Sequence, residues 1–252
     1  MTNFPDKIFG IDAKEAYKRV VKSLGEKVEE EPKITFSVNG VPSSDYIWLP
    51  KHKLYVAKRI TPTKKKFIGA HKELQDKNAR MLTLREFADF LLHLRDSYEV
   101  EDGLGEKLTR EQAIVTYKSI VLPDKHNRSE KLDAHFTKEY EEDIDGFGNE
   151  RKIINYSHKI IKGKLVPLKS ELLEDYLNDM RKVDLASFNK QGLPTKEGND
   201  FWFAPPIQNN TVAHFIIEPK NSWLNCRFDK FISGSDIGVR FAYEKQNFRS
   251  AK

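Results

Sequence analysis

The sequence predicts an α+β fold, with a helix-containing part first and an antiparallel β region at the C-terminal end. Apolar residues recur at helical spacing in the early and middle segments of the chain. From residue 200 onward they alternate with polar residues, as in half-buried strands. The strands therefore cluster at the end of the chain, which argues against a repeating βαβ arrangement around a parallel sheet.

The first segment of the chain predicts one helix and one strand. Residues 12–29 carry apolar residues at helical spacing, which is typical of an amphipathic helix. The helix ends at the run EEEP, because the residue before a proline disfavours the helical conformation. Residues 34–41 (ITFSVNGV) then predict a strand that enters an Asn-Gly turn. We expect residues 1–45 to pack on a main domain formed by residues 46–252.

The main domain begins with residues 46–60, in which aromatic and β-branched residues partly alternate with polar ones. This pattern predicts a strand pair or a bent strand. The clearest helix follows in MLTLREFADFLLHLRDS, where Thr83 and Glu86 have the spacing of an N-terminal capping box. Five apolar residues fall on one face of this helix: Leu84, Phe87, Phe90, Leu91 and Leu94.

The middle of the chain is highly charged and punctuated by glycines. Residues 100–150 predict a charged insertion or a set of surface loops, with a short helix around 109–119. Residues 152–161 predict a strand that turns at KGK, and SELLEDYLNDM predicts a helix over 170–180. The last strands are expected in FWFAPP, TVAHFII, SWLNCRF and IGVRFAYE.

Composition limits the class of protein. The 252 residues carry a formal net charge of +5, so the chain is mildly basic. No run of about 18 apolar residues is present, so we expect no membrane-spanning helix. The N-terminal residues lack the apolar stretch of a secretory signal. The chain has one cysteine, which excludes an internal disulfide framework.

Motifs for catalysis and metal binding are missing from the sequence. The seven histidines have neither i,i+4 partners nor a nearby cysteine pair, so the spacing predicts no metal site, and no cofactor is expected. Cys226 lies on the apolar side of a strand-like alternation, which predicts a buried, unreactive thiol. The basic segment 58–66 is typical of a solvated turn, with phosphate binding as the alternative.

The segment SWLNCRF indicates a surface for recognition. Leu224 and Cys226 alternate with Trp223, Asn225 and Arg227, so the last three face outward if the first two face the core. Tryptophan and arginine are the residues that dominate binding hot spots. The same reasoning places His214, Ile216 and Glu218 on the outward side of TVAHFIIEP. The alternative is that helices cover both faces of these strands.

Several motifs in this region resemble one known family. "DLASFNKQGLPTKEG", "FWFAPPIQNNTVAHF", "WLNC" and "SDIGVRF" resemble the C-terminal region of the variable proteins of diversity-generating retroelements, as found in archaea and their viruses. "YIWLPKHKLYVAKRITP" and "MLTLREFADFL" resemble the front half of the same family, so the resemblance covers about residues 45–245. It implies a C-type-lectin-like fold of the formylglycine-generating-enzyme type. In that fold the terminal G-V-R strand is core, while a nearby sheet face and its loops carry hypervariable residues.

The resemblance implies a non-enzymatic, receptor-like binding protein whose variable region spans residues 212–241. The residues expected to contact the ligand are Ile216, Glu218, Asn221, Trp223, Asn225, Arg227, Phe228, Phe231, Ile232, Gly234 and Asp236. The expected partner is a macromolecule, most simply a protein, and the expected location is cytoplasmic or virion-associated. Two alternatives stay open: an enzyme of the same fold that uses Cys226 or a bound metal, and a nucleic-acid-binding protein that uses residues 58–66.

The resemblance also assigns roles to the scaffold around this region. Leu224, Cys226, Ile237, Val239 and Phe241 are expected to hold the backbone rigid. Gly238 is expected to permit close packing, and Arg240 to pair with a partly buried acid. Trp223 and Glu218 are not products of adenine-directed mutagenesis, so they are fixed positions or signs of a copy that is no longer diversified. The paired cysteines of the enzymes are missing, so their chemistry is not implied.

Overall fold

The computed structural model describes residues 7–8, 11–12, 43–123, 125, 127–141 and 149–245. The chain divides into two units, Met1–Phe36 and Ser37–Lys252. In the first unit the described residues form a hairpin of β1 (Lys7–Ile8) and β2 (Ile11–Asp12). The helix expected over 12–29 and the strand expected over 34–41 lie outside the described residues, except that Asp12 belongs to β2. The packing of residues 1–45 on the main domain stays a prediction.

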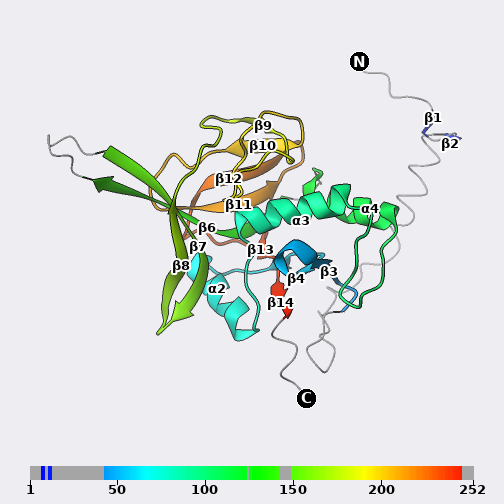
Figure 1. The fold of residues 1–252 in the computed structure, drawn as a ribbon, viewed down its shortest axis with the longest axis horizontal. Helices are drawn as coiled ribbons and strands as arrows, with labels where there is room; N and C mark the ends of the chain where they lie inside the picture. The colour runs from blue at the N-terminus through cyan, green and yellow to red at the C-terminus, as the bar shows by residue number, and fades with distance from the viewer. Residues whose placement is uncertain are drawn as a thin grey trace. The chain divides into compact units, whose positions relative to one another are not determined.

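The second unit combines helices with two sheets, which is compatible with the predicted α+β class (Figure 1). Its described helices are α2 (Phe67–Asp76), α3 (Leu84–Asp96), α4 (Arg110–Val121) and the short 3-10 helix η1 (Pro50–His52). Within the described ranges, no helix has the length and apolar content needed to cross a membrane.

The larger sheet has nine strands in the described part of the chain. Along its main path the order is β5-β13-β6-β11-β12-β10-β9, and β7 and β8 extend from β6 as a long hairpin (Figure 1). The bounds are β5 (Thr61–Pro62), β6 (Arg128–Glu141), β7 (Asn149–Ile161), β8 (Lys164–Leu172), β9 (Arg181–Val183), β10 (Phe201–Ala204), β11 (Thr211–Ile217), β12 (Ser222–Asp229) and β13 (Ile237–Val239). The expected antiparallel arrangement is only partly correct, because β10 runs parallel to β12 and β13 parallel to β6.

A smaller sheet of three strands has the order β14-β4-β3. It pairs strands from the beginning of the second unit with a strand from its end. It consists of β3 (Tyr46–Leu49), β4 (Leu54–Ala57) and β14 (Ala242–Glu244). The strand pair predicted over 46–60 is therefore confirmed. The pairing of β14 with β4 joins segments that are far apart in the sequence.

The segment 100–150 is not simply a set of surface loops. The short helix predicted near 109–119 is confirmed as α4, with a capping box formed by Thr109 and Gln112. β6 lies between β13 and β11 in the large sheet, and its residues Leu132, Ala134 and Phe136 are buried. The charges of β6 concealed this core strand, since Lys131, Asp133 and His135 alternate with its core residues and lie on the other face of the sheet.

The helix predicted over 170–180 is wrong. Residues up to Leu172 belong to β8, which pairs with β7, and the rest of the segment has no helix. Backbone N–H groups here bond to distant partners: Leu173 donates to the Lys152 carbonyl at 2.9 Å and Leu177 to that of Pro194 at 2.9 Å. These long-range bonds replace the i−4 bonds of a helix, so pairing with β7 overrides the local helical pattern.

The helix α3 agrees with the sequence prediction in detail. Thr83 and Glu86 form the predicted capping box, and the predicted apolar face is buried. Phe87 of α3 packs against Phe215 of β11, with ring centroids 5.0 Å apart. The main hydrophobic core therefore lies between α3 and one face of the large sheet.

The opposite face of the large sheet is called the polar face here. On β6 it is marked by Ser129, Lys131, Asp133 and His135, which alternate with the core residues of the same strand. Helix α2 contacts β7, and a second hydrophobic cluster that includes Phe67 packs with Val212 of β11. The polar face is thus partly covered.

The expectations for the terminal G-V-R strand are confirmed. Ile237, Val239 and Phe241 are buried. A Cβ atom on Gly238 would lie 2.7 Å from the Thr61 carbonyl oxygen, so a side chain there would collide with the backbone of β5. Arg240 pairs with the buried acid Glu130.

Cys226 is fully buried, as predicted, and burial raises the pKa of its thiol well above the usual range. We expect thiol reagents to leave the native protein unlabelled and to react with it after unfolding in denaturant. Cys226→Ser should lower the free energy of unfolding by about 1–3 kcal/mol, because it buries a hydroxyl without an assigned partner. Fast labelling of the native protein would contradict this prediction.

Candidate recognition surface

The strand register predicted for SWLNCRF is confirmed. Along β12, Leu224 and Cys226 are buried, whereas Trp223, Asn225 and Arg227 are partly exposed. On β11, Phe215 and Ile217 face the core and Ile216 is partly exposed. The predicted outward set therefore lies on the polar face or at its edge.

A stacked pair of partly exposed tryptophans lies on this face. Trp223 of β12 lies beside Trp202 of β10, with ring centroids 5.3 Å apart and an interplanar angle of 25°. The indole N–H of Trp223 donates to Glu218, and the indole N–H of Trp202 donates to Asn221, both at 3.2 Å. These bonds fix both rings, so the pair presents a rigid aromatic surface.

The tryptophans belong to a row of side chains that crosses four strands. Strand pairing places Ile216 of β11 opposite Trp223, Trp223 beside Trp202, and Trp202 opposite Lys182 of β9. The ammonium of Lys182 lies 6.0 Å from the Trp202 ring centroid. The row therefore combines an aliphatic, an aromatic and a cationic part, a composition that suits a macromolecular interface.

A bulge in β12 places one more predicted residue on this face. Val212 pairs with Phe228 and His214 with Asn225, so β12 has one residue more than β11 between these pairs. The extra residue turns Phe228 to the side of Asn225, where its ring stacks on His214 with centroids 4.4 Å apart. Phe228 and the fully buried His214 are packed against each other, so both belong to the support of the surface.

The remaining predicted residues lie in the 230–236 loop, which connects β12 to β13. Phe231 and Ile232 are 57% and 39% exposed, which is unusual for large apolar side chains in a loop. Asp229 orders the turn by accepting from the Phe231 N–H at 2.8 Å. The Asp236 carbonyl accepts from the Ser129 N–H at 2.9 Å and so holds the other end of the loop on β6. Gly234 lies between these two anchors.

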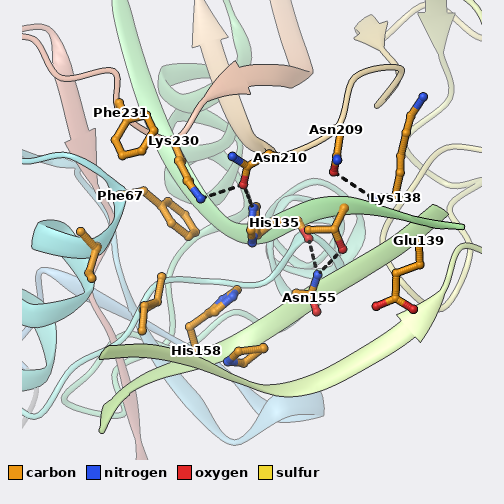
Figure 2. A pocket seen from close by; sticks show the side chains of 14 residues that line it. Phe67, His135, Lys138, Glu139, Asn155, His158, Asn209, Asn210, Lys230 and Phe231 are labelled. Atoms are coloured by element: carbon orange, nitrogen blue, oxygen red, sulfur yellow. Dashed lines mark hydrogen bonds between the residues drawn. The ribbon is translucent and has the colours of Figure 1, made fainter. Parts of the chain in front are cut away.

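Beside this loop is a cavity of about 770 Å³ (Figure 2). Asn210 links two of its walls, because its Oδ1 lies 2.8 Å from His135 Nε2 and 2.7 Å from Lys230 Nζ. Phe67 and Phe231 supply aromatic lining. The cavity is thus an aromatic and basic pocket, and Phe231 is the predicted site residue that belongs to it.

Sequence reasoning missed most of this pocket and part of the tryptophan row. Helix α2, which carries Phe67, was not predicted. The alternation in FWFA, with Phe201 and Phe203 buried, could have placed Trp202 outward. No local signal could have joined His135 of β6 to Asn210, because Asn210 lies in the turn before β11, 75 positions away.

Two further buried polar groups lie on the polar face. His214 Nδ1 lies 2.8 Å from the Ser129 hydroxyl, while its Nε2 has no hydrogen-bond partner in the described part of the chain. The Lys131 ammonium is also buried and lacks a hydrogen-bond partner among these residues. Burial lowers the pKa of Lys131 to about 8, and burial together with Lys131 lowers the pKa of His214 to about 3.

Acid should destabilise the protein partly through His214. As the pH falls below about 6.5, the unfolded chain binds a proton at this residue, but the folded chain does not until the pH approaches about 3. The contribution of His214 to the free energy of unfolding is therefore complete above the pKa that this residue has in the unfolded chain. It decreases as the pH falls, by up to about 1.4 kcal/mol per pH unit. Urea unfolding of His214→Asn should show a smaller pH dependence than wild type between about pH 6 and pH 4. Equal slopes would contradict this prediction.

One group of potential metal ligands lies within the described residues. His71 of α2, Asp133 of β6 and His158 of β7 are all buried, and their ligand atoms lie within 4.8 Å of one another. The sequence predicted no metal site because these residues are far apart in the chain.

Comparisons of the chain with protein-family models, with curated proteins and with solved structures found no match.

Proposed function

We propose that the chain is a non-enzymatic binding protein that displays a variable recognition surface on a C-type-lectin-like scaffold. The single observation that carries this proposal is the partly exposed Trp202–Trp223 stack at the centre of a side-chain row across four strands. The resemblance to the variable proteins of diversity-generating retroelements supports the same function. The ligand we propose is a protein, because a broad row of aromatic, aliphatic and charged side chains matches the composition of protein interfaces.

The division of roles along β12 supports variability of this surface. Leu224 and Cys226 pack in the main core, whereas the side chains of Trp223 and Asn225 are directed to the polar face. Substitutions at the second pair leave the core side chains in place, so we expect the scaffold to tolerate them. An enzyme that uses Cys226 is disfavoured, because the thiol is buried and its pKa is raised by burial.

The DNA that flanks the gene provides a direct test. We expect a reverse-transcriptase gene and a near-copy of the region encoding residues 212–241, with differences at adenines of the copy. These differences should fall in codons for outward residues such as Asn221 and Asn225 and should spare those for Leu224 and Cys226. A flanking region without such a repeat, or differences spread evenly over core codons, would overturn the retroelement part of the proposal.

A display experiment tests the binding surface independently of the gene's origin. One library randomises Asn221, Trp223, Asn225 and Arg227, and a matched library randomises the core positions Leu224, Cys226, Ile237 and Val239. We expect the first library to retain folded, protease-resistant protein and to yield binders to an arbitrary target protein such as lysozyme. The second should mostly fail to fold. Equal loss of folding in both libraries would contradict the proposed surface.

A further inference from the structure

We propose that His71, Asp133 and His158 bind one divalent transition-metal ion, with Zn²⁺ as the representative case. The three residues come from α2, β6 and β7, and their exposed fractions are 4%, 1% and 6%. Two imidazoles and one carboxylate form a ligand set that suits zinc and other late first-row metals. None of the three residues belongs to the proposed recognition surface, although His158 lines the same cavity as Phe231, and the inference does not depend on that proposal.

The distances fit a shared ion after a small side-chain adjustment. Ligand atoms that share an ion at about 2.1 Å lie about 3.0–3.5 Å apart. His71 Nε2 lies 3.6 Å from Asp133 Oδ1, close to this spacing. His158 Nδ1 lies 2.5 Å from the same oxygen, so it must move away by about 0.5–1 Å to ligate the ion.

The charge at this position also favours a cation. Asp133 is almost completely buried, and among the described residues its ion pairs are only with the two imidazoles. A buried carboxylate whose ion pairs are only with imidazoles is costly, and a divalent cation would neutralise it. His71 Nε2 is buried and makes no hydrogen bond within the described ranges. A metal ion would use this atom, which has no hydrogen-bond partner there.

The orientation of the ligands is favourable. Asp133 Oδ2 accepts from the backbone N–H of His158 at 3.0 Å, which orients the carboxylate. Ser157 has a φ of 56°, and this left-handed residue interrupts the alternation of β7 just before His158. As a result Asn155 and His158 both line the same cavity.

Two cavities provide a route for the ion. His158 lines the 770 Å³ pocket, and it also lines a second cavity of about 530 Å³ together with His71. Three protein ligands leave at least one coordination position, which water from these cavities can fill. An ion here would also join α2 to β6 and β7, so it would stabilise the packing of α2 on the polar face.

Zinc titration of the full chain tests the site. After treatment with a chelator and dialysis, Zn²⁺ binding is measured by calorimetry and the melting temperature is recorded with and without Zn²⁺. We expect one ion per chain and a higher melting temperature with Zn²⁺, since the ion binds the folded state. His71→Gln should weaken binding by more than about 100-fold, more than is usual for a residue that only supports a ligand. Co²⁺ should give visible absorption bands in wild type that His71→Gln lacks.

The control is His135→Gln, which changes a histidine of the same pocket and leaves all three proposed ligands intact. It should bind Zn²⁺ as wild type does. Asp133→Asn should lose binding as well, and His71→Gln keeps the test decisive if Asp133→Asn does not fold. The proposal is overturned if wild type binds no Zn²⁺, if His71→Gln binds as tightly as wild type, or if His135→Gln loses binding equally.

Discussion

Arg240→Met should lower the free energy of unfolding by about 3–5 kcal/mol, because it leaves a buried carboxylate unpaired. Arg240 Nε and Nη2 donate to the two oxygens of Glu130 at 3.0 and 2.9 Å. Its Nη1 also donates to the carbonyls of Ala57 and Lys58 at 2.8 and 2.6 Å. Arg240 and Glu130 are 3% and 4% exposed, so water can replace few of the hydrogen bonds that the substitution removes. Arg240 therefore ties β6 to the end of β4.

A double-mutant cycle separates the interaction energy between Arg240 and Glu130 from the cost of burying their charges. Glu130→Met alone should destabilise the protein by a similar amount, since it leaves the guanidinium buried without its acid. The double variant Arg240→Met, Glu130→Met should recover much of the loss, because it buries no unpaired charge. The measurement is urea unfolding of the four proteins at pH 7. A double variant whose loss equals the sum of the single losses would contradict the proposed coupling.

Leu224→Ala should lower the free energy of unfolding by about 2–5 kcal/mol, since Leu224 is buried in the main core and its truncation leaves a cavity. Trp223→Ala, one residue away, should cost only about 1 kcal/mol, the scale expected for a partly exposed side chain outside the core. Neighbouring residues on a strand face opposite sides, so this pair is a matched comparison of core and surface.

Binding should show the reverse order of effects. Trp223→Ala should abolish binding to a partner selected on the wild-type surface while the protein stays folded. A partial core substitution, Leu224→Val, should keep that affinity, because it leaves the outward side chains in place. Melting curves and a binding titration on the three variants provide the comparison. If Trp223→Ala unfolds the protein and Leu224→Ala is tolerated, the register of β12 is shifted by one residue.

The sequence by itself determined those features that depend on neighbouring residues. The capping box of Thr83 and Glu86 acts across a single helical turn, so its spacing identified the start of α3. The alternation in SWLNCRF placed Leu224 and Trp223 on opposite sides of β12, because a strand repeats every two residues. The burial of Cys226 followed from the same alternation. The resemblance to a retroelement variable protein stays a prediction.

Only the tertiary structure decided the features that depend on distant segments. Residues 170–180 have a helical pattern, yet pairing with β7 and bonds to remote carbonyls outweigh that weak local preference. The cluster of His71, Asp133 and His158 joins α2 to β6 and β7, and Glu130 meets Arg240 across 110 positions of the chain. Such contacts form because burial and strand pairing bring segments together, and no short window of sequence contains both partners. The periodicity of the sequence therefore shows which side chains point away from the core, while the fold decides which of them come into contact.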